Sequence, residues 1–382
     1  AYDEDALGSF AGIVDRAGTV TGPTSNEGLG ARVDLATTRS AAYSGRATIG
    51  SRSYSFRGLL DTASANPQGA SLIKLSRSET LALTFSINAE TGALTGSLAD
   101  LGTSATLTGW RCLAARDPAL AARLGRHHLF ADIPGGPLST SLPEGTSFAS
   151  ASVTSSGTTV ISGRTATGDA IVGSSRIGTS GEVLLYRTLD AGRASFFGQI
   201  SIAADPAHTL TGALTWSRLA NPRSLIYPAG WSPPVALQAR GVLYTPASLD
   251  TGTGITMGLN ATALGVANAF LEFLGGGVES SSTSPATVVR ISSTASVSPI
   301  TPNPNAVSLK IRNSNGSVTG SFVLTDGSIH RKVAFQGLIV PNTATPALDD
   351  GLGYGWFLLP ELPGTSRDLK RSGLVLLGPN LP

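Results

Sequence analysis

The chain has 382 residues and a formal net charge of +2, and only 14% of its residues are charged. This length exceeds one ordinary hydrophobic core and predicts two or three domains. The near-neutral charge excludes a strongly acidic or basic protein. The arginines are scattered singly instead of being grouped on one face, which argues against nucleic-acid binding. The 46 glycines and 22 prolines exceed the average and predict many turns.

One feature of the sequence predicts export. The chain begins at Ala1 without a methionine, as signal-peptide cleavage would leave it, so we expect an extracellular or cell-surface protein whose signal peptide is already removed. No apolar run reaches the ~18 residues of a transmembrane helix. The single cysteine, Cys112, cannot form an intramolecular disulfide, and we interpret it as a buried thiol.

Alternation of apolar and polar residues predicts strands along almost the whole chain. The first series is expected at 8–14, 31–36, 42–49, 52–60, 71–75, 81–87, 93–98 and 104–112. A short helix is expected at 117–124, where Asp117 can cap the first turn. The second series is expected at 126–133, 147–154, 158–164, 170–176, 183–188, 194–202, 209–218 and 235–244. The third is expected at 270–274, 287–291, 306–311, 317–324, 331–340, 353–359 and 373–377, with 279–305 partly a long loop.

This order predicts an all-β fold, in which antiparallel meanders form two or three consecutive small barrels or sandwiches. The expected units are a β-meander of about eight strands at 1–116 and a short helical connector at 117–125. A second meander at 126–250 and a third β unit at 251–382 follow.

Five triplets, each an apolar residue, a Ser or Thr and a glycine, recur where one strand is expected to hand over to the next. Their glycines are Gly45, Gly96, Gly163, Gly212 and Gly320. A glycine within a strand pattern marks a bulge, a bend or a close backbone approach. We therefore expect these structural glycines at equivalent bends of repeated hairpins.

The run RSYSFRGLLD at 52–61, the ALTGSL and SVTGSF turns, VAFQGLIV at 333–340, and the closing GYGWFLLP and SGLVLL carry a resemblance. The chain resembles uncharacterised, glycine-punctuated β-repeat modules of large secreted and cell-surface bacterial proteins. The resemblance covers most of the chain and implies location and architecture. It brings no catalytic signature.

The sequence contains few residues in patterns that are typical of catalysis or metal binding. His127 and His128 are adjacent on an expected strand, so their rings point to opposite faces and cannot share a metal ion. We interpret them as partly exposed strand histidines. No nucleophile motif stands between a strand and a helix. The acidic turns at 3–5 and 349–351 lack the spacing of a calcium loop and are interpreted as solvated turns. We therefore predict no enzyme and no catalytic, cofactor or metal site.

Trp231 lies among prolines in an expected loop and is the best candidate for a ligand contact. The favoured function is a non-catalytic extracellular structural or assembly protein, a β-repeat scaffold that packs against copies of itself or another cell-surface protein. One alternative is a barrel that binds a glycan or small ligand in its mouth or at Trp231. A second is an outer-membrane β-barrel, for which aromatic residues at 6% are few.

Overall fold

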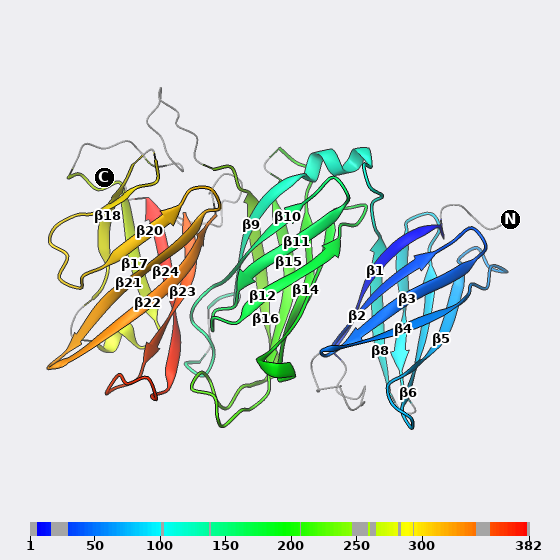
Figure 1. Ribbon diagram of the computed structural model, residues 1–382, viewed down its shortest axis with the longest axis horizontal. Coiled ribbons are helices and arrows are strands. Elements are labelled where there is room, and N and C mark those ends of the chain that lie inside the picture. Colours follow the sequence, from blue (N-terminus) through cyan, green and yellow to red (C-terminus); the bar gives the residue numbers. More distant parts are fainter. Residues whose placement is uncertain are drawn as a thin grey trace.

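The computed structural model describes residues 6–16, 30–100, 103–136, 139–206, 208–246, 259, 265–281, 284–292, 294–340 and 352–379. In these ranges the chain is almost entirely β-strand and forms three consecutive antiparallel sheets of eight strands each. The sheets follow one another along the long axis of the molecule, the first and third at opposite ends (Figure 1).

The first sheet contains β1 (Gly8–Val14), β2 (Ala31–Thr37), β3 (Ala42–Ile49), β4 (Arg52–Leu59), β5 (Gln68–Lys74), β6 (Thr80–Ile87), β7 (Ala93–Ala99) and β8 (Ser104–Arg111). The second contains β9 (Gly125–Asp132), β10 (Ser147–Val153), β11 (Thr158–Arg164), β12 (Ala170–Arg176), β13 (Glu182–Leu189), β14 (Ala194–Ile202), β15 (Leu210–Arg218) and β16 (Trp231–Leu243). The third contains β17 (Ala269–Gly275), β18 (Thr287–Ile291), β19 (Val297–Pro299), β20 (Ser308–Arg312), β21 (Ser317–Asp326), β22 (Ile329–Ile339), β23 (Gly353–Pro360) and β24 (Lys370–Pro379). The described residues also contain the 3-10 helices η2 (Pro118–Arg123), η3 (Asp190–Gly192) and η4 (Val278–Ser280).

Each sheet is an up-and-down meander whose first strand pairs with its last, so that the sheet curls into a nearly closed barrel. The first barrel runs β4-β3-β2-β1-β8-β7-β6-β5 and is open between β4 and β5, where a single bridge joins Asp61 and Gln68. The second is open between β12 and β13, and the third between β19 and β20. The predicted all-β fold of consecutive small barrels is confirmed.

The interior of each barrel is a packed core. In β6, the alternate residues Leu81, Leu83, Phe85 and Ile87 are at most 4% exposed and point inward, as the alternation predicts. The same pattern around each barrel collects one large apolar cluster per barrel. Burial of each such side chain contributes roughly 2 kcal/mol, so the closed meander is the arrangement that hides the apolar face of every strand.

Each of the five glycine triplets lies within a single strand, and those of Gly45, Gly96, Gly212 and Gly320 fall in the first four residues of their strands, directly after a turn. Gly45 and Gly163 lie on the third strands of the first two barrels, and Gly96 and Gly212 lie on the seventh. Gly320 lies on β21, the fifth strand of its barrel. The first two barrels therefore repeat the triplets at matching strands, and the third barrel does not.

Gly96 and Gly320 lie where a neighbouring strand comes very close. A Cβ on Gly96 would collide with the carbonyl oxygen of Thr84, and one on Gly320 with that of Ser308. Each glycine also stands opposite a phenylalanine of the adjacent strand, Phe85 in one case and Phe335 in the other. Only a residue without a side chain fits between these neighbours.

The expected helix at 117–124 is a 3-10 helix, η2, that packs on the second barrel. The side chain of Asp117 accepts a hydrogen bond from the Ala119 amide at 2.9 Å, as predicted for the cap. Leu120 belongs to the core of the second barrel, and Arg123, 8% exposed, donates to the Ile202 carbonyl at 3.0 Å. The helix thus covers one end of that barrel. The expected loop at 279–305 contains a short strand, β19, that sequence alternation did not reveal.

Replacing Gly96 or Gly320 with Val should reduce the free energy of unfolding by roughly 1–3 kcal/mol, because the new side chain forces two strands apart. Gly173 on β12 is the matched control, since a Cβ there meets nothing within 4 Å. Gly173→Val should be neutral or stabilising because valine favours strands. Urea unfolding of the three variants measures this. Equal effects at all three positions would contradict the close-approach argument.

Candidate functional site at the barrel junctions

A half-buried arginine joins the first barrel to the second. Arg16, just after β1, donates from Nη1 to the Ser195 hydroxyl at 2.6 Å and from Nε to the Thr215 hydroxyl at 2.9 Å. Its guanidinium lies 4.1 Å from the centre of the Phe197 ring. These donors and the ring contact fix the orientation of one barrel on the other more precisely than apolar contact alone would.

The first barrel also covers the opening of the second. Arg32 donates to the Ser174 carbonyl at 2.7 Å, which is a backbone acceptor on the edge strand β12. On the other edge strand, β13, the Tyr186 hydroxyl donates to the Gly30 carbonyl at 3.1 Å and accepts from the Gly50 amide at 2.9 Å. An open edge invites pairing with other chains, and here the neighbouring barrel occupies it.

Apolar side chains complete this junction. The cluster consists of Ala11, Ile13, Trp110, Cys112, Leu184 and Phe197. Burial raises the pKa of the Cys112 thiol to about 12, so the thiolate does not form at neutral pH. The interpretation of Cys112 as a buried thiol is confirmed by its 7% exposure.

The second junction is formed around β9, the first strand of the second barrel, just as the first junction is formed around β1. On the outward side of β9, Phe130 stacks on Tyr354 with ring centres 4.2 Å apart. A second apolar contact joins Phe148 of β10 to Leu338 and Trp356 of the third barrel. The signal that could have revealed both junctions is the loss of alternation in β1 and β9, where five consecutive residues are buried.

Hydrogen bonds reinforce this second junction near β24. The Ser372 hydroxyl donates to the Ala166 carbonyl at 2.5 Å, and the Ser372 amide donates to the Tyr227 hydroxyl at 3.1 Å. The Lys370 amide donates to the Leu225 carbonyl at 2.8 Å. The second and third barrels are therefore joined by backbone as well as side-chain contacts.

The two adjacent histidines point to opposite faces, as predicted, but both are fully buried, so their interpretation as partly exposed residues is wrong. His127 stacks on His208 with ring centres 5.7 Å apart. His128 donates from Nδ1 to the Ile339 carbonyl at 2.6 Å and stacks on Tyr244 at 4.0 Å. Burial lowers the pKa of each imidazole to about 4. Both rings are therefore neutral near pH 7, and His128 serves as packing between two barrels.

Trp231 is a core residue, so the prediction of an exposed loop position is wrong. It begins β16, is 7% exposed, and donates from Nε1 to the Trp216 carbonyl at 2.9 Å. A register shift lets β16 continue back through Pro233 and Pro234 until Trp231 faces Arg218. Prolines are tolerated at such irregularities, which is why a strand segment reads as a loop in the sequence.

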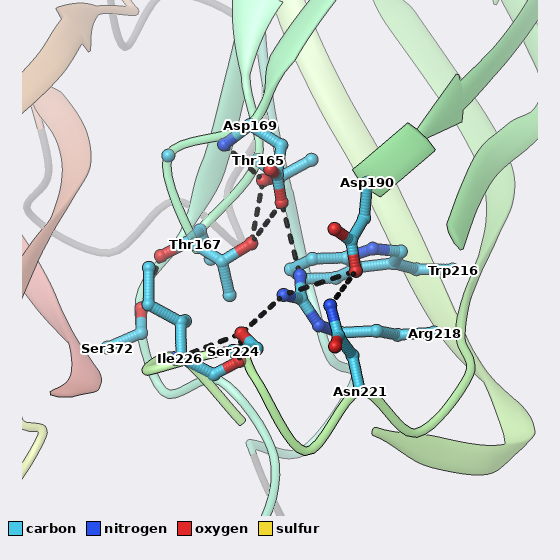
Figure 2. A network of polar contacts seen from close by, with 12 residues as sticks. Thr165, Thr167, Asp169, Asp190, Trp216, Arg218, Asn221, Ser224, Ile226 and Ser372 are labelled. Atoms are coloured by element: carbon cyan, nitrogen blue, oxygen red, sulfur yellow. Dashed lines mark hydrogen bonds and ion pairs between the residues drawn. The ribbon is translucent and has the colours of Figure 1, made fainter. Parts of the chain in front are cut away.

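Below Trp216 a buried charged network closes the other end of the second barrel, and Figure 2 shows Arg218 between two carboxylates. The Arg218 side chain is 5% exposed and lies 3.3 Å from an oxygen of Asp169 and 3.8 Å from one of Asp190. Ser224 accepts a further hydrogen bond from Arg218 at 3.2 Å. Thr167 donates to Asp169 at 2.8 Å. The two carboxylates neutralise the buried guanidinium of Arg218, and the network has a structural role at this end of the barrel.

Two grooves accompany the two junctions. The first junction groove, about 830 Å³, lies on the outward face of β1–β4 against Cys112 and Arg176. The second junction groove, about 460 Å³, lies on the outward face of β10 and β11 against β21 and β22. Ser44, Gly45 and Arg46 line the first, and Ser162, Gly163 and Arg164 line the second. Gly45 and Gly163, two of the predicted structural glycines, therefore lie at corresponding positions in the two grooves.

Other chemistry is sparse in the described part of the chain. No group of three or more His, Cys, Asp or Glu side chains among the described residues is placed to hold a metal ion. Within the same ranges, no helix has the length and apolar character needed to span a bilayer. The two acidic turns at 3–5 and 349–351 lie outside the described residues.

No family model matches the chain, and no curated protein matches it. Among solved structures, one similar chain is a double mutant of the vaccine antigen transferrin-binding protein B from Haemophilus parasuis Hp5. The two are 11% identical with a TM-score of 0.23, and the match covers 97% of this chain and 74% of that one. At that TM-score the likeness carries no argument about function.

Acidification should destabilise the folded chain through its buried histidines. The unfolded chain binds these protons near pH 6.5, whereas the folded chain binds them only near pH 4, so stability falls as the pH drops between these values. Each histidine costs up to about 3 kcal/mol by pH 4. His128→Asn keeps a donor for the Ile339 carbonyl but cannot titrate. Its unfolding free energy should therefore fall less steeply from pH 7 to pH 5 than that of the wild type.

The control for this measurement is His330→Asn, because that ring is exposed. Parallel pH profiles for wild type and His128→Asn would show that His128 does not contribute.

Replacing Arg218 with Leu should lower the free energy of unfolding by roughly 1–3 kcal/mol, because Asp169 and Asp190, which are partly exposed, then lose their shared counter-ion. Arg187→Leu, at an exposed position on β13, should change it by less than about 0.5 kcal/mol. Thermal and urea unfolding distinguish the two. Similar values for both variants would remove the structural role assigned to the network.

Proposed function

We propose that this chain is a non-catalytic, extracellular structural or assembly protein. It is a rod of three β-barrels that packs against copies of itself or a partner at the cell surface. Its barrels have packed interiors, and its junctions hold successive barrels through buried polar and apolar contacts. These features favour a rigid spacer, and they fit the secreted β-repeat modules that the sequence resembles.

The observation that carries this proposal is an exposed surface on the third barrel that corresponds to the junction surfaces of the first two barrels. The outward residues of β1 and β9 are covered by the next barrel, as in Ile13, 9% exposed, and Phe130, 2% exposed. The corresponding first strand of the third barrel, β17, leaves Leu274 45% exposed. Leu274 pairs with Leu374 of β24, and Val288 of β18 is 37% exposed. The outward residues of β17 and β24 are mainly apolar, with Glu272 among them, and a face of this kind favours docking of another barrel.

The other end of the rod carries a surface that this face could meet. Leu59 and Leu72 are 73% and 71% exposed and lie on β4 and β5, the two strands that flank the opening of the first barrel. In the second barrel the corresponding opening receives the first barrel. Two different surfaces at opposite ends allow head-to-tail contacts, which extend into filaments when the rotation does not close.

The alternatives have less support. A ligand in a barrel mouth has little room, because large side chains fill the interiors and Trp231 is among them. An outer-membrane barrel presents apolar residues to lipid, whereas here the alternating apolar residues face inward. Support for glycan binding comes from the junction grooves and not from a barrel mouth or Trp231.

The proposal predicts that the protein self-associates with rising concentration and that Leu274→Asp weakens this association, because a charge cannot be buried in the apolar face. Sedimentation velocity measures the shift. Leu362→Asp is the matched control, since Leu362 is 56% exposed between β23 and β24 and lines neither junction groove. A protein that stays monomeric at every concentration, with no partner recovered from its native source, would overturn the proposal.

A further inference from the structure

The two junction grooves repeat one sequence element at the same place in the fold. Ser44-Gly45-Arg46 lies on β3, and Ser162-Gly163-Arg164 lies on β11, the third strands of the first and second barrels. Residues two apart on a strand point to the same side, so each element presents a hydroxyl and a guanidinium outward. Ser44, Arg46, Ser162 and Arg164 are all exposed. The glycine between each pair points inward against the adjacent strand.

Both grooves concentrate positive charge on a chain that is otherwise nearly balanced. Arg46, Arg57 and Arg176 line the first groove together with one acid, Asp34. Asp34 already forms an ion pair with Arg32 at 2.7 Å. The described residues that line the second groove include Arg126 and Arg164 and no acid. The whole chain has 27 basic and 25 acidic residues, so this bias is local and favours an anionic ligand.

Backbone carbonyls orient three of these arginines. Arg164 donates to the Gly168 carbonyl at 3.0 Å, Arg126 to that of Ser314 at 3.0 Å, and Arg176 to that of Leu113 at 2.7 Å. A guanidinium has five donors, so one such bond holds it in place and leaves capacity for a carboxylate or sulfate. Ordering the side chain before the ligand arrives reduces the entropy that binding costs.

The rest of the lining is rich in hydroxyl and amide groups. Ser9 and Ser55 line the first groove, and Ser150, Ser152, Ser317, Thr319, Asn315 and Gln336 line the second. The backbones of β2, β3, β10 and β11 are paired on both sides, so in the first groove an extended peptide can add as a strand only at an edge such as β4. The three phenylalanines of the linings, Phe10, Phe56 and Phe148, are buried and offer no platform for stacked bases. The groups that remain suit a hydroxylated, anionic ligand.

We propose that the two junction grooves form a binding track for an acidic polysaccharide. The arginines bind its carboxylate or sulfate groups, and the serine and threonine hydroxyls bind its sugar hydroxyls. Because the grooves lie at successive junctions of one rod, a long polymer can occupy both, which raises its apparent affinity without new contacts. This inference does not depend on self-association of the rod.

The test uses polygalacturonate, a carboxylated polysaccharide, in affinity electrophoresis and calorimetry at low ionic strength. Wild type should bind it, and binding should weaken as salt is added. The double variant Arg46→Gln/Arg164→Gln should bind about tenfold more weakly, because it removes one exposed charge contact from each groove. The matched control Arg77→Gln/Arg223→Gln removes the same charge from exposed positions outside both grooves and should retain wild-type affinity within about twofold.

Further measurements separate this inference from its rivals. Dextran, an uncharged polysaccharide, should not bind, and trigalacturonate should bind more weakly than the polymer because it cannot span both grooves. Leu274→Asp should bind polygalacturonate as wild type does, whatever its effect on association. No binding by wild type, or equal losses in the groove and control variants, would overturn the proposal. Equal binding of polyglutamate would overturn the choice of a polysaccharide over an acidic peptide.

Discussion

The rest of the structure depends on one strand in each of the first two barrels that is buried on both faces. The first strand pairs with the last to close the meander, and its inward residues complete the core. Its outward residues, such as Ile13 on β1 and Phe130 on β9, then pack against the next barrel. Closure and docking therefore share the same backbone, and a change that loosens one loosens the other. This coupling makes a row of separate meanders into a rod.

Buried arginines lie at the ends of the barrels, where the alternating apolar pattern of the strands stops. Arg218 closes one end of the second barrel with Asp169 and Asp190, and Arg123 on η2 covers the opposite end. Arg331 of the third barrel is 5% exposed and pairs with Asp326 at 2.7 Å. Each guanidinium satisfies several carbonyl or carboxylate acceptors at once, which lysine with its point charge does not. This explains why the buried cations at the barrel ends are arginines.

The grooves follow from the same geometry. Two round barrels that touch along one strand leave a recess on either side of the contact line, and the outward side chains of the neighbouring strands line it. A Ser-Gly-Arg element on the third strand then faces the recess in both of the first two barrels. The glycine is needed because its neighbours leave no room for a side chain, as at Gly163 beside the Phe148 carbonyl. Its flanking serine and arginine supply the polar lining.

By itself, the sequence determined the strands and their number with little error, because alternation reports directly which side of a strand faces a core. The alternation in β6 and the cap at Asp117 are local signals, and both are found in the structure as predicted. Alternation says nothing of what covers the outward side. Only the tertiary structure decided that His128 lies buried between two barrels and that Trp231 joins a core across a register shift. It also decided that Ser44 and Arg46 line one groove and that Ser162 and Arg164, each 118 residues further along the chain, line the corresponding groove. Contacts between barrels depend on the curvature of closed sheets and on the position of each opening, and neither is encoded in the period of a single strand.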